Sequence, residues 1–466
     1  MSLIRTISGV RGVIGDTLSP EVIVAHIAAF TMMLEGPLYH QKQHKIVVGR
    51  DSRVSGPWVE RLVVGTLSAC GYHVYQIGIA TTPTVQFMTT ELKCSGGIVI
   101  TSSHNPVEWN GLKFIGSDGL FISPEACESL FKLADEKIPM SRYVTYDKVG
   151  AIEVVDHANR KHLDAIYALP FIDVEKIRSQ HFRCCLDTVN GAGGPIMREL
   201  CHRLDIEIVD GLNMEPTGLF AHTPEPIPAN LSQLCESVRK HNVDFGIAVD
   251  PDVDRCVFID EHGKPLGEEY TLAMAVEFML GDVGRRGVVA KNLSSSRALD
   301  DIAKKYESRV VCAPVGEIQV AQCMLRENAV IGGEGNGGVM LPDIHIGRDA
   351  PVAAALAFQL MANRGIRKIS EVKKTLPQYE IVKLKAGIEG LNPDAILNDY
   401  KAEYRGKQGV LINEDDGLKI DAPEWWVHLR KSNTEHIIRV IAEAKDLELA
   451  TSIAAKFIQE IESKRK

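Results

Sequence analysis

The sequence predicts an α/β protein made of three α/β units and a smaller C-terminal α+β unit. Over residues 1–150, apolar strand-like runs alternate with segments of helical periodicity, which is typical of βαβ units. Similar strand-and-loop units return over 151–258 and over 259–370. Over 371–466 the pattern changes to short strands at antiparallel spacing, followed by one long terminal helix. These changes of pattern place the expected domain boundaries after residues 150, 258 and 370.

The first unit contains the clearest elements. Helices are expected over 21–34, 59–70 and 85–92, and strands over 45–49, 74–79 and 97–100. Near the start, two glycines flank Arg11 within residues 8–12. They predict a sharp turn that can present the guanidinium to a phosphate. A surface turn with a solvated Arg11 is the alternative.

The most informative stretch is residues 101–106, Thr-Ser-Ser-His-Asn-Pro, directly after the expected strand at 97–100. The Asn-Pro pair predicts a tight turn, so Ser103 and His104 lie at the carboxyl end of a strand, where open α/β sheets bind ligands. His104 is too close in sequence to Ser103 to act as a triad base, so we interpret Ser103 as a phosphoryl carrier beside a metal. A polar turn with a structural histidine is the alternative.

Three carboxylates, Asp250, Asp252 and Asp254, lie at alternate positions between two apolar runs. Close carboxylates repel one another, and a hard cation relieves that repulsion. An EF-hand loop would need glycine where Arg255 stands and helices where strands are expected. A phosphatase of the haloacid dehalogenase type would place its aspartates after the first strand of its core domain. Mg²⁺, with a phosphate as a further ligand, fits best, and a solvated acidic loop remains the alternative.

Two later loops carry groups that suit a ligand. Residues 332–338 form a glycine-dense loop in which Glu334 and Asn336 are the only side chains able to bind hydroxyl groups. Residues 430–435 collect hydroxyl, amide and guanidinium donors, which favours anion binding. By contrast, the glycine-rich turn at 187–194 lacks the Lys-Ser/Thr ending of a P-loop, so we interpret it as a packing turn.

Composition excludes several classes of partner. The chain has 61 acidic and 52 basic side chains, a formal net charge of −9, so neither nucleic acid nor an anionic membrane is an expected partner. No apolar run is long enough to span a membrane, and the first residues lack the apolar core of a signal peptide. Ten scattered cysteines without CxxC spacing indicate reduced thiols in a cytoplasmic protein.

Taken together, these stretches resemble the α-D-phosphohexomutase family. Its four motifs occur here in order: the phosphoserine loop at 101–106, the metal loop at 250–255, the sugar loop at 333–338 and the phosphate loop at 430–435. The resemblance covers the whole chain. It implies three α/β domains with mixed sheets around a central cleft, plus a smaller C-terminal α+β domain.

The resemblance also implies a role for each candidate residue. Ser103 would carry the phosphoryl group, and its phosphate would share one Mg²⁺ with Asp250, Asp252 and Asp254. The other catalytic residues would be Arg11 and Lys113, in proton transfer and in steadying the phosphoryl group, together with His104. The substrate-binding residues would be Arg255, Lys291, Glu334, Asn336, Arg430, Ser432, Asn433, Thr434 and Arg439.

The implied reaction moves a phosphoryl group between C6 and C1 of a hexose phosphate through a 1,6-bisphosphate, which also serves as activator. Asn336 stands where many relatives carry serine, and His436 where proline is common. The loop at 315–317 lacks the histidine of some glucose/mannose enzymes, which favours glucosamine 6-phosphate as substrate. Glucose or mannose phosphates are the alternative.

Two further alternatives are a sugar-phosphate-binding protein without turnover and a plain phosphatase. Both are disfavoured by the complete set of catalytic residues and by the phosphate loop. A monomer or a homodimer is expected.

Overall fold

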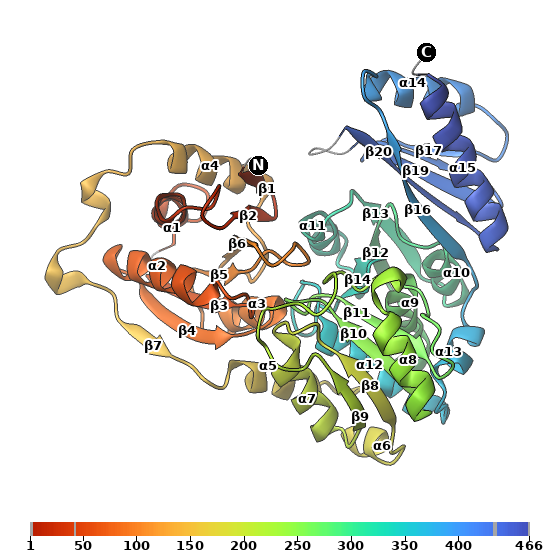
Figure 1. Ribbon diagram of the computed structural model, residues 1–466, viewed down its shortest axis with the longest axis horizontal. Helices are drawn as coiled ribbons and strands as arrows, with labels where there is room; N and C mark the ends of the chain where they lie inside the picture. Colours follow the sequence, from red (N-terminus) through yellow and green to blue (C-terminus); the bar gives the residue numbers. More distant parts are fainter. Residues whose placement is uncertain (1–2, 42, 432–435, 465–466) are drawn as a thin grey trace.

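The computed structural model describes residues 3–41, 43–431 and 436–464. It has four sheets, one for each of four successive parts of the chain. Figure 1 shows the first part in red and orange, the second and third packed against each other in green and teal, and the fourth in blue at the opposite end of the molecule from the first. The expected α/β class with a smaller C-terminal α+β domain is confirmed.

The first sheet is mixed and has the order β1-β2-β6-β5-β3-β4-β7. Its strands are β1 (Ile4–Thr6), β2 (Gly9–Val13), β3 (Lys45–Arg50), β4 (His73–Ile79), β5 (Gly96–Ile100), β6 (Trp109–Gly116) and β7 (Ile152–Val154). Alternate side chains of β3 and β5 face opposite layers. One layer contains α1 (Pro20–Glu35), α2 (Gly56–Ala69) and α4 (Pro124–Asp135), and the other contains α3 (Thr82–Glu91).

The second and third sheets share one hydrophobic core. The second has the order β11-β10-β8-β9, with β8 (Arg183–Asp187), β9 (Glu207–Leu212), β10 (Phe245–Val249) and β11 (Cys256–Asp260). The third has the order β13-β12-β14-β15, with β12 (Val288–Asn292), β13 (Arg309–Ala313), β14 (Ile331–Glu334) and β15 (Gly338–Met340). Helix α12 (Ala350–Arg364) is apolar over most of its surface and buried between the two sheets, which explains why these parts form one core.

Helices complete these two parts. The second contains α5 (Ala158–Tyr167), α6 (Val174–Arg178), α7 (Gly193–Arg203) and α8 (Ser232–His241). The third contains α9 (Glu269–Glu277), α10 (Ala298–Lys305), α11 (Glu317–Glu327) and α13 (Ile369–Thr375). The loops that follow β10 and β14 face the first domain, because residues 255, 334 and 336 line one cavity together with residue 103.

The fourth sheet is wholly antiparallel, in the order β16-β20-β19-β18-β17. Its strands are β16 (Glu380–Gly387), β17 (Leu411–Asn413), β18 (Leu418–Asp421), β19 (Trp425–Lys431) and β20 (Ile437–Ala444). Helices α14 (Pro393–Tyr404) and α15 (Leu447–Ser463) pack on it around Phe457. The long terminal helix expected from the sequence is α15, whereas β16 and α14 were not predicted.

Some local expectations need correction. Arg11 does not lie on a sharp turn: it is the centre of β2, which pairs with β1 and β6. Strand β7 pairs with β4, so the first sheet continues past residue 150. The expected boundaries at 258 and 370 fall inside β11 and α13.

The sequence also led us to expect reduced cysteines and no membrane-spanning segment. All ten cysteines are free thiols, and all are buried except Cys312. Among the described residues, no helix combines the length and the hydropathy needed to cross a bilayer.

Candidate active site

Ser103 lies on the tight loop between β5 and β6 and is almost fully buried. Its φ of 48° is in the left-handed region, a costly conformation for a residue with a side chain. The backbone N–H of Ser103 donates to Thr101 Oγ1 at 2.9 Å, which fixes the turn. The loop therefore presents the Ser103 hydroxyl in one orientation rather than leaving it on a flexible segment.

Arg53, which sequence reasoning did not single out, holds this loop in place. It is completely buried, and its Nη atoms donate to the carbonyls of Ser103, Asn105, Pro106 and Trp109 at 2.6–2.8 Å. Its Nε donates to Asp51, which also accepts from Thr101 Oγ1 at 2.7 Å. The five N–H donors of a guanidinium suit such a cluster of carbonyls.

The three predicted carboxylates converge in the loop between β10 and β11. Asp250, Asp252 and Asp254 are fully buried and each offers an oxygen within 4.8 Å of the others. Asp252 Oδ1 and Asp254 Oδ1 have no hydrogen-bond partner among the described residues. Buried carboxylate oxygens without a donor are costly, and a hard cation satisfies them. The donor set therefore fits Mg²⁺.

Ser103 completes this group, because its Oγ lies 3.4 Å from Asp250 Oδ2. The glycine-rich turn after β8 packs beneath the metal loop: Ala192 N donates to Pro251 O at 2.8 Å, and a Cβ on Gly191 would lie 2.5 Å from Pro251 Cα. That turn has the packing role that the sequence indicates.

Lys113 and Arg348 provide positive charges beside the three aspartates. Lys113 Nζ donates to Asp252 Oδ2 at 2.6 Å and lies 3.6 Å from Asp254 Oδ2. Burial favours a raised pKa for Asp252, but the Lys113 ammonium holds that pKa below its ordinary value. Burial and the charges of Asp254 and Asp252 raise the pKa of Asp250 well above its ordinary value. A bound cation would remove that repulsion.

The remaining predicted catalytic side chains surround Ser103. His104 Nδ1 lies 3.3 Å from Ser103 Oγ and 3.4 Å from Arg255 Nη2. Burial and the charges of Arg255 and Arg11 lower the pKa of His104 to about 2, so its imidazole is neutral. Arg11 Nη1 donates to Asn105 Oδ1 at 3.2 Å, and burial lowers the pKa of Arg11. Arg255 also pairs with Glu225 at 3.2 Å.

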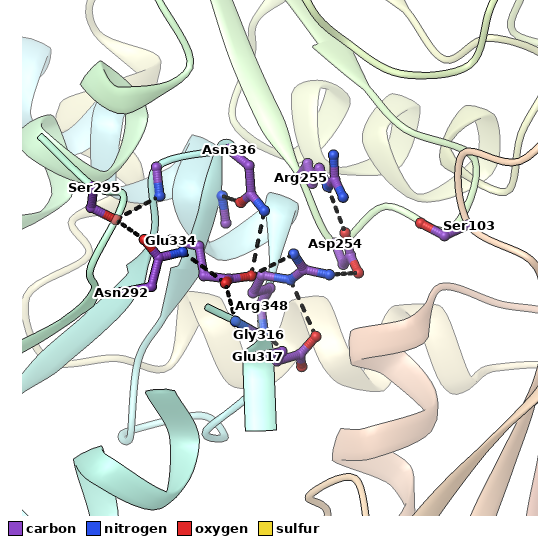
Figure 2. A network of polar contacts seen from close by, with 12 residues as sticks. Ser103, Asp254, Arg255, Asn292, Ser295, Gly316, Glu317, Glu334, Asn336 and Arg348 are labelled. Carbon is purple, nitrogen blue, oxygen red and sulfur yellow. Dashed lines mark hydrogen bonds and ion pairs between the residues drawn. The ribbon is translucent and has the colours of Figure 1, made fainter. Parts of the chain in front are cut away.

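A cavity of about 240 Å³ connects Ser103 to the sugar loop. It is lined by Ser103, His104, Arg11, Lys113, Arg255, Glu317, Glu334, Asn336, Arg348 and neighbouring loop residues. In the view of Figure 2, Ser103 lies on one side of Asp254 and Arg255, and Glu334, Asn336 and Arg348 lie on the other side. The structure therefore brings together predicted residues from three domains.

Arg348 was not predicted, yet it joins the metal loop to the sugar loop. Its three nitrogens contact three carboxylates: Asp254 Oδ2 at 2.6 Å, Glu334 Oε2 at 2.8 Å and Glu317 Oε2 at 3.2 Å (Figure 2). These neighbours outweigh burial and raise the pKa of Arg348 well above its ordinary value. The only signal in the sequence is an Arg-Asp pair before a helix, which is too weak to identify a contact.

Lys291, predicted to bind substrate, contacts protein groups of the third domain. It is buried beneath the loop after β12, where its Nζ donates to Ser296 O at 2.9 Å and pairs with Asp300. It is not among the residues lining the cavity beside Ser103.

The predicted phosphate-binding residues lie on the fourth domain. Arg430 and Arg439 are directly opposite each other on β19 and β20, and Lys385 of β16 is opposite Arg439. Like charges at such positions repel one another, and a bound anion relieves the repulsion. Arg430 Nε lies 2.7 Å from Asp416 Oδ2, which also accepts from Val315 N at 2.9 Å. The predicted Ser432, Asn433 and Thr434 lie outside the described residues.

The comparisons with known proteins identify the family. Four models of the phosphoglucomutase/phosphomannomutase group match in succession: α/β/α domain I over residues 3–138, domain II over 160–263, domain III over 267–379 and the C-terminal domain over 382–460. The chain belongs to the phosphoglucomutase/phosphomannomutase family. The resemblance read from four short loops is thereby confirmed, and the chain is a phosphohexomutase, an isomerase that transfers a phosphoryl group.

Relatives within this family differ in substrate. A phosphoglucomutase/phosphomannomutase of Thermococcus kodakarensis is 36% identical over 95% of this chain and 94% of its own. A phosphoglucosamine/phosphogalactosamine mutase of Sulfurisphaera tokodaii is 31% identical over 98% of each chain. A solved family protein of Burkholderia thailandensis superposes with a TM-score of 0.80 at 23% identity, over 98% of this chain and 95% of that one, which shows the shared fold.

Proposed function

We propose that this phosphohexomutase interconverts hexose 6-phosphate and hexose 1-phosphate through phospho-Ser103, with glucosamine 6-phosphate as its preferred substrate. The observation that carries the proposal is the 3.4 Å separation of Ser103 Oγ from Asp250 Oδ2 inside a cavity that also contains the sugar loop. A nucleophile beside three converging carboxylates suits phosphoryl transfer, in which positioning and charge neutralisation do most of the work. A phosphatase would not need a second anion site on the fourth domain.

We infer that one Mg²⁺ is held by Asp250, Asp252, Asp254 and the Ser103 phosphate. The oxygen-only donor set favours a hard cation, and the ion would supply positive charge to a phosphoryl oxygen. Lys113 fixes the orientation of Asp252, and Arg348 that of Asp254.

In the reaction the phosphoryl group passes from Ser103 to a substrate hydroxyl, whose proton must leave. Arg11 and Lys113 lie in the cavity where they can steady the moving group and take part in proton transfer. Neutral His104 can accept a hydrogen bond through Nδ1 from the Ser103 hydroxyl that the transfer regenerates. Arg255 adds charge on the substrate side, and Glu334 and Asn336 bind sugar hydroxyls.

The product of the first transfer is a hexose 1,6-bisphosphate, which must turn over within the cleft before its other phosphate returns to Ser103. The cations of the fourth domain hold whichever phosphate is not reacting. Added 1,6-bisphosphate would act as an activator by phosphorylating Ser103. Movement of the fourth domain would allow the turn while excluding water.

The choice of glucosamine depends on the loop at 315–317 and on relatives such as the Sulfurisphaera mutase, while the Thermococcus relative favours glucose or mannose as the alternative. The proposed setting is a cytoplasmic monomer or homodimer acting on small sugar phosphates.

A coupled mutase assay with Mg²⁺ and a trace of 1,6-bisphosphate tests this function. It compares kcat/KM for glucosamine 6-phosphate, glucose 1-phosphate and mannose 1-phosphate. A preference of about tenfold for glucosamine, roughly 1.4 kcal/mol in the transition state, supports the proposed substrate. Ser103→Ala should abolish turnover while Ser102→Ala retains it, and an active Ser103→Ala enzyme would contradict the phosphoserine mechanism.

A further inference from the structure

Two glutamates line the cavity beside Ser103, and they differ in how much of their hydrogen-bonding capacity is already used. A carboxylate has about four acceptor positions. Glu334 Oε1 accepts from Asn292 Nδ2 at 2.8 Å and from Gly316 N at 2.9 Å. Glu334 Oε2 accepts from Arg348 Nη1 at 2.8 Å and from Asn336 Nδ2 at 3.4 Å. All four positions of Glu334 are therefore engaged by the protein.

Glu317 accepts fewer hydrogen bonds than Glu334, and they are longer. Its Oε2 accepts from Arg348 Nε at 3.2 Å, and its Oε1 from Arg348 N at 3.3 Å and Gln86 Nε2 at 3.4 Å. Every contact is long for a charged hydrogen bond, and one acceptor position has no donor among the described residues. Burial raises the pKa of Glu317 to about 7 although Arg348 is adjacent, which agrees with an incompletely compensated carboxylate.

The surrounding charges decide what Glu317 can bind. Arg11, Lys113, Arg255 and Arg348 all line the same cavity, so a substrate bearing an ammonium group meets repulsion there unless a carboxylate contacts it. Among the described residues lining this cavity, Glu317 and Glu334 are the only carboxylates. Three positions of Glu334 are held by donors at 2.8–2.9 Å, and its fourth, where Asn336 lies at 3.4 Å, is needed for a sugar hydroxyl. Glu317 is therefore the carboxylate with an acceptor position left for an ammonium group.

We propose that Glu317 is a specificity-determining residue that binds the 2-amino group of glucosamine phosphate. The carboxylate would act as counter-ion to the ammonium, whereas a neutral 2-hydroxyl gains only an ordinary hydrogen bond at the same place. This inference rests on the proposed function in one respect, that a hexose phosphate occupies the cavity. It assigns Glu317 to substrate selection in place of a purely structural contact with Arg348.

The test measures kcat/KM for glucosamine 6-phosphate and glucose 1-phosphate in the wild type, Glu317→Gln and Glu317→Asp. Glu317→Gln should lower kcat/KM for glucosamine at least tenfold and for glucose less than threefold. Glu317→Asp keeps the charge and should retain most of the preference. Glu327→Gln, at the far end of the same helix and paired with Arg309 at 2.8 Å, should change neither rate, and Glu334→Gln should lower both together.

Equal losses for the two sugars in Glu317→Gln would show that the side chain only supports Arg348 and would overturn the inference. A wild type without any preference for the amino sugar would also overturn it, while leaving the mutase reaction intact. If the wild type turned over no hexose phosphate, the proposed function would fail. Calorimetric binding of glucosamine 6-phosphate and glucose 6-phosphate to the wild type and Glu317→Gln would then decide the role of Glu317 by itself.

Discussion

The surroundings of Ser103 and the cationic strands of the fourth domain are built differently, although we propose that both bind phosphate. Around Ser103, the nucleophile and the three aspartates are at most 2% exposed, and one arginine holds four backbone carbonyls. On the fourth domain, the Arg430 side chain is 23% exposed and Arg439 is exposed. One region is rigidly organised before substrate arrives, and the other is open.

The difference follows from what each region must accept. In the proposed reaction the Ser103 region performs the same transfer in both directions, so a single geometry serves it and preorganisation lowers the barrier. In that reaction the fourth domain would hold the 1-phosphate in one half of the cycle and the 6-phosphate in the other. Exposed guanidinium groups on adjacent strands can meet a phosphate from several directions, because each presents donors in a fork.

The largest effect should come from loosening the rigid region at Arg53. Arg53→Lys keeps a counter-charge for Asp51 but has three donors instead of five and cannot reach all four carbonyls. A displacement of Ser103 by about 1 Å can cost roughly 10²-fold in rate. We therefore expect kcat to fall on the order of 10–100-fold with little change in KM, as measured by steady-state kinetics.

The matched control is Arg61→Lys, on the exposed side of α2, which should retain wild-type kinetics. Thermal unfolding of both variants would separate loss of fold from loss of positioning. Full kcat in a folded Arg53→Lys enzyme would show that the Ser103 loop keeps its conformation without the five-donor guanidinium. The rigidity of the Ser103 region would then not depend on Arg53.

Some residues and elements of these two regions could be predicted from the sequence, and others could not. Ser103 and the three aspartates could be identified because each motif is contiguous and follows a buried strand, so a few neighbouring letters contain the whole signal. The α/β class also followed from local periodicity. Strand β16 and helix α14 were missed because β16 is half-exposed and lacks a clean alternation, and its place in the sheet depends on pairing with β20, far along the chain.

Arg53 and Arg348 could not be predicted for a related reason. Arg348 contacts residues 94, 31 and 14 positions away, and Arg53 contacts carbonyls 50–56 positions away. Nothing within a few residues of either arginine marks these partners. The prediction that Arg11 binds phosphate was based on a turn that is absent, because its glycines allow close strand pairing instead: a Cβ on Gly9 would lie 2.0 Å from Leu112 O.

A smaller effect is expected from the open region. Arg430→Met removes a charged donor for the non-reacting phosphate, which is worth about 1.5–3 kcal/mol. KM for the hexose phosphate should rise at least tenfold while kcat changes little, because Ser103 and the aspartates are untouched. Inorganic phosphate should also become a weaker competitive inhibitor. Lys407→Met, which removes an exposed cation of the same domain paired with Glu403, is the control. Unchanged KM in Arg430→Met would place the phosphate elsewhere.

The smallest effect concerns the loop that covers Arg53. The ring centroid of Phe220 lies 4.9 Å from Arg53 Cζ. Two residues later, His222 Nε2 lies 2.9 Å from Asp187 Oδ2. This hydrogen bond raises the pKa of His222 above its ordinary value. A raised pKa in the folded state stabilises the protein fully below the unfolded pKa of about 6.5, and the contribution is lost as pH rises through the folded value.

His222→Gln should therefore lower the apparent Tm by roughly 1–2 °C near pH 5.5 and by less near pH 8.5. Scanning calorimetry at both pH values measures the difference, and His202→Gln, at the exposed C-terminal end of α7 in the second domain, is the control. A Tm loss that does not depend on pH would mean that His222 contributes packing and not charge. In that case the cover over Arg53 would be held by Phe220 and the loop backbone, and the rigidity of the Ser103 region would not vary with protonation.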